Sequence, residues 1–264
     1  MQTSPLTIHA LPALETNYIW VLTPDGQTRT SVVDPGDAAP VIHYFEHGAG
    51  QDRTLDYILL THHDHDHTDG VEALVSRYQP HIIGPESVKH VTSPVSDGDE
   101  FDLFGTRVNV IATPGHTLDH VVYLLAGDPP CLLAGDTLFM AGCGRLFEGN
   151  ATQMQTNCAR LRTLPGDTLV YAAHEYTQSN LAFAHTVEPD NRDISHAIAT
   201  CTDLAHLGRP TLPTRLSVER KINPFMRVDE ESVQDAVHQK FPDVPRDNDT
   251  AVIFGLLREW KDHF

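Results

Sequence analysis

The chain has 264 residues, of which 40% are hydrophobic and 20% are charged. These proportions are typical of a globular protein with one large domain or two smaller ones. The formal net charge of −18 disfavours nucleic acid and anionic membranes as partners, because the surface repels them. No stretch approaches the roughly 20 apolar residues of a membrane-spanning helix. Residues 1–14 lack the basic segment and apolar run of a signal peptide.

The cysteine pattern is consistent with a cytoplasmic protein. Cys131, Cys143, Cys158 and Cys201 form no Cys-x-x-Cys pair and no spacing typical of a zinc ribbon or a disulfide framework. Reduced thiols in a reducing compartment are therefore expected. Cys143 lies in a glycine-rich segment and is an alternative candidate nucleophile, although no histidine is close to it in the sequence.

Short apolar, β-branched runs separated by turn residues predict a series of strands through the first two-thirds of the chain. In chain order these are residues 17–22, 30–33, 55–60, 107–112, 121–125, 131–134 and 168–172. Several are followed by a residue that can bind a metal ion. A layered α/β scaffold presents a site in this way, at the ends of its strands.

The last third of the chain has helical periodicity. Apolar residues recur at helical spacing within 193–207 and again within 252–260. The proline-rich segment 210–224 between them is predicted to be a connector. We place a domain boundary between a first domain, residues 1–175, and a small helical domain, residues 176–264.

The segment from His62 to His67 reads His-His-Asp-His-Asp-His, and every side chain in it can bind a metal ion. Imidazoles crowded in this way repel one another when protonated and are unfavourable to bury without partners. The alternative is a solvated His-rich loop that binds metal only fortuitously.

Three further residues favour a metal site, because each closely follows a predicted strand. These are His116, Asp136 and His174. Neutral imidazole and carboxylate together suit zinc, iron or manganese. A carboxylate such as that of Asp136 can bridge two ions, as in two-metal hydrolytic sites.

The order His-x-x-x-Asp-His, followed by His116, Asp136 and His174, resembles the pattern of the metallo-β-lactamase superfamily. Within that superfamily the chain resembles the hydroxyacylglutathione hydrolase (glyoxalase II) family. The segments that carry this resemblance are 17–20, 33–36, 113–117, 135–139, 142–149, 174–176, 223–228 and 258–264. The resemblance implies an α/β fold: a metallo-β-lactamase-like αββα sandwich with a small C-terminal helical domain.

The resemblance also implies two divalent metal ions per chain, which are zinc, with iron or manganese as alternatives. The ligands that it places around the first ion are His62, Asp64, His116 and the bridging Asp136. Those that it places around the second are Asp66, His67, Asp136 and His174. It assigns Asp66 a catalytic role as well, in orienting the attacking hydroxide.

One position departs from the family motif His-x-His-x-Asp-His, because Asp64 stands where the second histidine is expected. Using His63 and His65 as the pair does not restore the motif, since His67 then falls at the aspartate. We therefore expect Asp64 to be a carboxylate ligand, as in the flavodiiron branch of the superfamily. Such harder ligation favours iron or manganese over zinc. The alternative is a weak or empty first site.

Smaller departures surround this motif. Asp69 and Asp119 stand where the family usually has glycine, and Asn150 stands where it usually has threonine. His65 is expected to be solvated or to support a ligand. These changes affect the fine geometry that the resemblance implies, not the fold.

The activity that the resemblance implies is hydrolysis of S-D-lactoylglutathione to D-lactate and glutathione, the second step of methylglyoxal detoxification. A thiolate is a good leaving group, so the reaction requires no strong general acid. One alternative is iron-dependent oxygen or persulfide chemistry on a glutathione substrate. The other, motivated by Asp64, is a catalytically impaired glutathione-binding homologue.

Glutathione carries two carboxylates and one ammonium group. Basic side chains are therefore needed to bind it, although the protein as a whole is acidic. The residues that the resemblance assigns to glutathione binding are Arg145, Phe147, Tyr176, Arg258 and Lys261. Arg258 and Lys261 share a face of the last predicted helix. The alternative for this pair is a solvated helix end, where basic residues are favoured. No macromolecular partner is predicted, and the chain is expected to be monomeric.

Overall fold

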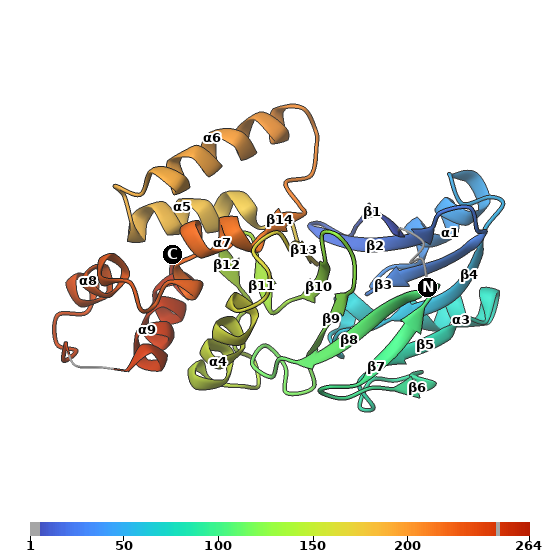
Figure 1. Ribbon diagram of the computed structural model, residues 1–264, viewed down its shortest axis with the longest axis horizontal. Helices are drawn as coiled ribbons and strands as arrows, with labels where there is room; N and C mark the ends of the chain where they lie inside the picture. Colours follow the sequence, from blue (N-terminus) through green and yellow to red (C-terminus); the bar gives the residue numbers. More distant parts are fainter. Residues whose placement is uncertain (1–5, 247–248) are drawn as a thin grey trace. The chain divides into compact units, whose positions relative to one another are not determined.

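The structure is a computed structural model that describes residues 6–246 and 249–264 (Figure 1). The chain divides into two compact units. The first contains Met1–Ala112 and Asp119–Gly135, and the second contains Thr113–Leu118 and Asp136–Phe264. None of the helices in the described ranges is long and apolar enough to cross a membrane.

A mixed six-stranded sheet forms much of the first unit. Its strands lie in the order β1 (Leu6–Ala13), β2 (Asn17–Pro24), β3 (Arg29–Val33), β4 (Thr54–Leu59), β5 (His81–Gly84) and β6 (Ser93–Pro94). Strands β1 to β3 are antiparallel, whereas β3 to β6 are parallel. Parallel neighbours need a crossover connection, which α1 (Ala38–His47) and α3 (Val71–Tyr78) supply. Val41 and Leu74 of these helices pack with Ile58 of β4 in one buried apolar cluster.

A second set of strands in this unit is antiparallel. It contains, in spatial order, β10 (Cys131–Gly135), β9 (Val121–Leu125), β8 (Thr106–Ala112) and β7 (Glu100–Leu103). The buried Tyr123 hydroxyl of β9 donates a hydrogen bond of 2.6 Å to the carbonyl of Leu60, just beyond β4. The side chains of Tyr57 and Phe104 also meet edge to face, with ring centroids 5.5 Å apart. The two sets of strands therefore pack face to face.

The second unit is mainly helical. It contains the short hairpin β11 (Leu138–Phe139) and β12 (Gly142–Cys143), and the pair β13 (Leu169–Ala172) and β14 (Thr214–Arg215). Its helices are α4 (Ala151–Arg162), α5 (Thr177–Val187), α6 (Arg192–His206), α7 (Leu216–Ile222), η1 (Pro224–Met226), α8 (Glu231–Lys240) and α9 (Thr250–Asp262). Helices α5 and α6 run side by side (Figure 1). The buried rings of Phe183, Phe225 and Phe254 form part of the core.

The seven predicted strands are confirmed as β2, β3, β4, β8, β9, β10 and β13, and the two predicted helices as α6 and α9. The prediction of a connector over 210–224 is wrong, because this segment contains β14 and α7. Its prolines lie outside α7, and Pro224 begins η1, where proline is well tolerated. Leu216 and Ile222 of α7 are fully buried. The prolines therefore mark the limits of a helix rather than its absence.

Candidate functional site

The His-rich segment follows β4 and leads into the single turn of α2 (His65–Thr68). The side chains of His62 and His67 are buried, with ring centroids 4.1 Å apart. The His62 Nε2 atom lies 3.6 Å from Asp64 Oδ2, and the His67 Nε2 atom lies 3.5 Å from Asp66 Oδ2. The segment is therefore not a solvated loop. It gathers the four candidate ligands of the first unit.

Outer partners fix the orientation of these two imidazoles. The Asp34 carboxylate accepts hydrogen bonds of 2.8 Å from both the backbone N–H and the hydroxyl of Thr61, and it lies 3.2 Å from His67 Nδ1. The Thr61 hydroxyl also lies 2.9 Å from His62 Nδ1. Both Nδ1 atoms therefore face polar partners, and the Nε2 atoms face the carboxylates of Asp64 and Asp66. Support of this kind keeps metal-binding imidazoles in a fixed orientation.

Two close backbone contacts explain why positions 36 and 70 are glycine. A Cβ atom at Gly36 would lie 1.7 Å from the carbonyl oxygen of Asp66, and one at Gly70 would lie 2.4 Å from the carbonyl oxygen of Pro35. Only glycine allows the 34–37 turn to approach α2 so closely. The Asn17 amide donates to the Asp66 carboxylate over 3.0 Å and to its carbonyl over 3.2 Å.

In the second unit, Asp136 lies between two histidines. Its Oδ2 atom is 3.5 Å from His116 Nε2, and its Oδ1 atom is 3.3 Å from His174 Nε2. All three side chains are buried. Because each carboxylate oxygen faces a different imidazole, Asp136 has the arrangement expected of a carboxylate that bridges two ions.

The hydrogen-bond partner of His116 Nδ1 determines which ring nitrogen of His116 carries the proton. His116 Nδ1 lies 2.8 Å from the carbonyl oxygen of Arg145, which can only accept a hydrogen bond. Nδ1 therefore carries the proton, and the lone pair of Nε2 is directed toward Asp136. A Cβ atom at Gly144 would lie 2.1 Å from the Asp136 carbonyl oxygen and 3.2 Å from His116 Nδ1, so this approach also requires glycine.

The donor chemistry in each unit fits divalent metal ions. Buried imidazoles face carboxylates at 3.3–3.6 Å in both sets, and nitrogen and oxygen donors of this kind bind zinc, iron and manganese. Asp64 belongs to this arrangement because its carboxylate faces Nε2 of His62, the atom through which that imidazole would bind a metal ion. The departure from the family motif therefore keeps a donor atom at that position.

Two of the predicted glutathione-binding cations, Arg145 and Arg258, form ion pairs with Asp262. The Asp262 Oδ1 atom lies 3.0 Å from Arg258 Nη2 and 3.5 Å from Arg145 Nε. Arg258 is buried, with 6% of its surface exposed, and its Nη1 donates to the carbonyl of Cys143 over 2.9 Å. The alternative of a solvated helix end is therefore wrong for Arg258.

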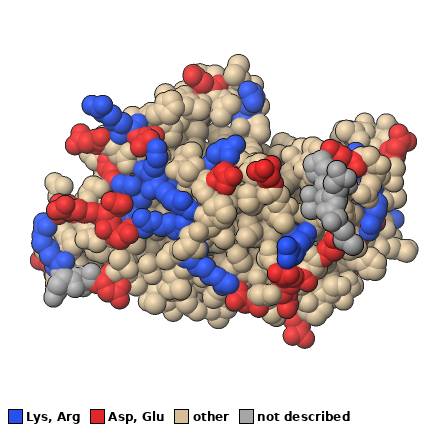
Figure 2. Space-filling model, viewed as in Figure 1, with Lys and Arg blue, Asp and Glu red and all other residues tan. Residues whose placement is uncertain are grey.

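Lys261 belongs to the same group of charges. Its Nζ donates to the carbonyl of Ser179 over 3.0 Å. Burial, and then the positive charges of Arg258 and Arg145, lower the pKa of Lys261 to about 8. Figure 2 shows Lys and Arg side chains gathered, with acidic side chains beside them, around the C-terminal end labelled in Figure 1.

Two aromatic residues of the predicted set lie against the histidines of this unit. The ring of Tyr176 stacks on that of His174, with centroids 4.6 Å apart and planes 3° from parallel. The ring of Phe147 lies 4.9 Å from that of His116. Phe147 is 64% exposed and Tyr176 is 38% exposed, so both present apolar surface to solvent beside candidate ligands.

Cys143 does not have the properties of a nucleophile. Its side chain is buried, and burial raises the pKa of the thiol to about 11. A reactive cysteine instead needs a lowered pKa and access to substrate. The backbone carbonyl of Cys143 accepts a hydrogen bond from Arg258.

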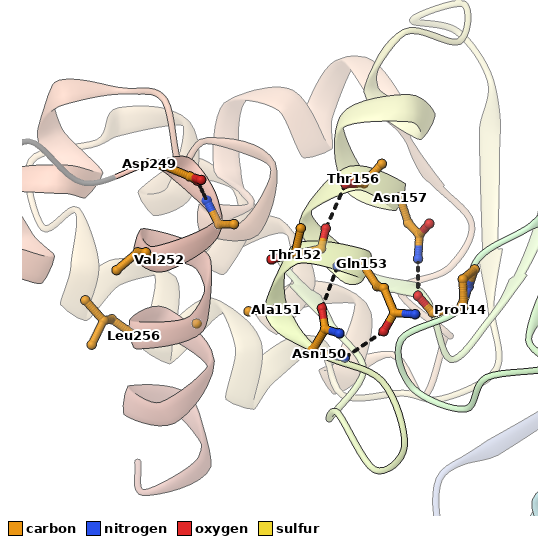
Figure 3. Close-up of a pocket in the computed structure, with 12 residues that line it drawn as sticks. Pro114, Asn150, Ala151, Thr152, Gln153, Thr156, Asn157, Asp249, Val252 and Leu256 are labelled. Atoms are coloured by element: carbon orange, nitrogen blue, oxygen red, sulfur yellow. Dashed lines mark hydrogen bonds between the residues drawn. The ribbon is translucent and has the colours of Figure 1, made fainter.

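A separate groove of about 800 Å³ lies between α4 and α9 (Figure 3). Its polar side chains are used within the fold. Asn150 and Gln153 form a reciprocal cap at the start of α4, and Asp249 caps α9. The Asn157 amide donates to the carbonyl of Pro114 over 2.7 Å. None of the predicted substrate residues lines this groove, and we do not assign the substrate to it.

Asp34 and Asp262 were not predicted from the sequence, although both support candidate site residues. Asp34 lies within the segment 33–36 that carries the family resemblance, so a signal was present. Asp262 lies within 258–264, but only the folded structure shows that its carboxylate meets both Arg145 and Arg258.

Comparison with known proteins gives matches along nearly the whole chain. Residues 175–264 match the family described as hydroxyacylglutathione hydrolase C-terminus, and residues 13–93 and 84–174 match the metallo-beta-lactamase superfamily. The chain is 47% identical over 261 residues to the hydroxyacylglutathione hydrolase of Chromohalobacter salexigens, covering 98% of this chain and 100% of that relative. It is 46% identical over 262 residues to the hydroxyacylglutathione hydrolase of Pseudomonas fluorescens, covering 98% and 100%.

A solved structure gives the same result for the fold. The crystal structure of ETHE1 from Myxococcus xanthus matches with a TM-score of 0.65 and 25% identity over 92% of both chains. The predicted fold class, an α/β sandwich of this superfamily followed by a helical region, is confirmed.

Proposed function

Since this chain belongs to the hydroxyacylglutathione hydrolase family of the metallo-β-lactamase superfamily, we propose that it hydrolyses S-D-lactoylglutathione to D-lactate and glutathione. The observation that carries this proposal is that the likeness includes residues 175–264, where Arg258 and Lys261 lie. The family implies a dinuclear metal site. We propose methylglyoxal detoxification as the physiological role.

The proposed metal ligands are those that the family pattern implies. They are His62, Asp64, His116 and Asp136 for one ion, and Asp66, His67, Asp136 and His174 for the other. When bound, divalent ions lower the pKa of water to about 7 and polarise a carbonyl group. Zinc, iron and manganese all suit these donors, and the carboxylate of Asp64 favours iron or manganese at the first position.

The protein side chains hold the reactants in this proposal. Asp66, held by the Asn17 amide, would orient the water that attacks the thioester carbonyl. Arg145, Arg258 and Lys261 bind the carboxylates of glutathione, and Phe147 and Tyr176 pack against its apolar parts. The glutathione thiolate is a good leaving group and needs no proton donor. This is consistent with a set of side chains that contains bases and cations but no evident general acid.

We propose a cytoplasmic, monomeric protein with no nucleic-acid partner. The four cysteines, all within the described residues, form no disulfide, and the net charge of −18 repels nucleic acid. The domain division into 1–175 and 176–264 is also a proposal, and the ranges of the two family matches support it.

The deciding experiment measures metal content and hydrolysis of S-D-lactoylglutathione on the purified chain and on Asp64→His. The proposal expects about two ions per chain and turnover in the unmodified protein. A metal-poor, inactive chain that gains both properties in Asp64→His would instead identify an impaired first site. Iron-dependent consumption of oxygen with glutathione persulfide, without thioester hydrolysis, would favour the redox alternative.

A further inference from the structure

His63 lies between two carboxylates within the first unit. Its Nδ1 atom is 3.0 Å from each carboxylate oxygen of Asp119, and its Nε2 atom is 3.7 Å from Asp64 Oδ1. The Ser87 hydroxyl donates a hydrogen bond of 2.6 Å to Asp119 Oδ2. A continuous row of polar contacts therefore leads from Ser87 through Asp119 and His63 to Asp64.

The two oxygens of Asp64 have different neighbours. Oδ2 faces the buried His62 at 3.6 Å, whereas Oδ1 faces His63. The side chain of Asp64 is 25% exposed. The terminal torsion of an aspartate is broad, so its carboxylate plane needs a neighbour to fix it. His63 is placed to do this at Oδ1, the carboxylate oxygen that does not face His62.

Asp119 in turn fixes His63. The His63 side chain is 42% exposed, but that of Asp119 is only 13% exposed and is anchored by Ser87. Because a carboxylate oxygen accepts hydrogen bonds, the Nδ1 edge of His63 is held toward Asp119, and the Nε2 edge is turned toward Asp64.

We propose that Asp119 and His63 form an outer relay that positions the Asp64 carboxylate and thereby sets the metal affinity of the first position. The inference rests on the proposed role of Asp64 as a ligand. It also relates two of the departures from the family pattern, because the unusual ligand Asp64 and the unusual Asp119 meet the same imidazole. Supporting residues of this kind typically change metal affinity by about 10–100-fold.

The chain offers a matched control in the same loop. His65 and Asp69 form a similar pair, with Nδ1 and Oδ1 2.9 Å apart, but their side chains are 94% and 65% exposed. Exposed pairs contribute little to stability. Asp69→Asn therefore removes a carboxylate that contacts a neighbouring histidine, His65, without removing a contact to His63.

The experiment titrates metal-free Asp119→Asn, Asp69→Asn and unmodified protein with Zn²⁺ and with Mn²⁺ in competition with a chromophoric chelator. We expect Asp119→Asn to weaken the first-position affinity by about 10-fold or more, and Asp69→Asn to change it by less than about 2-fold. Equal effects of the two substitutions would overturn the relay. Thermal unfolding of the metal-free variants checks that Asp119→Asn is folded, and His63→Gln replaces it if it is not.

A double-mutant cycle tests whether the effect passes through Asp64. In the Asp64→His background the carboxylate that His63 faces is absent, so adding Asp119→Asn should no longer change affinity. An undiminished loss in that background would also overturn the relay. These outcomes are read from metal affinity, whereas the proposed activity is read from thioester hydrolysis by the unmodified chain, so either can fail without the other.

Discussion

The Oδ2 atom of Asp34 lies 3.2 Å from the Nδ1 atom of His67, and both side chains are buried. Asp34 has a positive φ of 50°, a conformation that aspartate and asparagine tolerate better than most residues. The Asp34 carboxylate therefore orients His67, a candidate metal ligand, from a left-handed backbone conformation that few residue types adopt readily.

Asp34→Asn tests this support. The amide keeps the shape and tolerates the backbone conformation, but it loses one acceptor oxygen and the negative charge beside His67. We expect metal affinity to fall by about 10–100-fold in chelator competition. Asp37→Asn is the control, because asparagine caps α1 about as well as aspartate does. An unchanged affinity in Asp34→Asn would show that His67 needs no such partner.

The proposed contact of Lys261 with glutathione predicts a pH dependence of the substrate affinity. Because the pKa of Lys261 is lowered to about 8, the lysine is charged below that pH and loses its charge as the pH rises through it. We expect KM for S-D-lactoylglutathione to increase above about pH 8, well before an ordinary lysine would titrate. In Lys261→Arg the charge persists, so KM should stay flat from pH 7 to about 9.5. A parallel rise in both proteins would assign the titration to another group.

Glu219 gives the stability a pH dependence of its own. Burial raises the pKa of Glu219 to about 7, although the Ala141 N–H, the Thr214 hydroxyl and the Asn223 amide all donate to it. A carboxyl with a raised pKa contributes stability that is fully present below its ordinary value of 4.5 and is lost as the pH rises through 7.

We therefore expect the free energy of unfolding of the protein to fall by about 3 kcal/mol more than that of Glu219→Gln between pH 4.5 and 7.5. Urea denaturation at a series of pH values measures the difference. Stability curves that run parallel for the two proteins would contradict the raised pKa.

Gly36→Ala should be among the most damaging single substitutions in the first unit. The added Cβ would lie 1.7 Å from the Asp66 carbonyl oxygen, which is backbone and cannot rotate away. We expect a loss of more than about 4 kcal/mol in stability, or loss of bound metal if the loop shifts instead. Gly166→Ala is the control, since its nearest neighbours would be 3.4 Å away. Thermal unfolding and metal content measured together separate the two outcomes.

The sequence predicted seven strands because their β-branched runs end at clear turn residues, as at 121–125, but it did not predict β1, β5 or β7. It failed over 210–224, where prolines that limit α7 were interpreted as a connector. It also did not predict α4 or α8, whose buried positions include polar Asn157 and His238 and so weaken the apolar periodicity.

The candidate ligands were predictable because they follow strands in a recognisable order. The residues that support these ligands and the substrate-binding cations were less predictable, because each support depends on contacts between segments far apart in the chain. Asp119 is 56 residues from His63. The contact between Arg258 and the Cys143 carbonyl spans 115 residues. Spacing along the chain carries no direct signal of such pairs.

The pairing of Arg145 and Arg258 with Asp262, and the nearby positive charge of Lys261, have a kinetic consequence in a chain of net charge −18. A dissolved glutathione conjugate, itself a net anion, meets repulsion at a distance and attraction only at close range. Added salt screens the distant repulsion first, because the screening length is about 10 Å at 0.1 M. Substrate capture, measured as kcat/KM, should therefore rise with moderate ionic strength before it falls, the reverse of the monotonic decline seen when an enzyme attracts its substrate from afar.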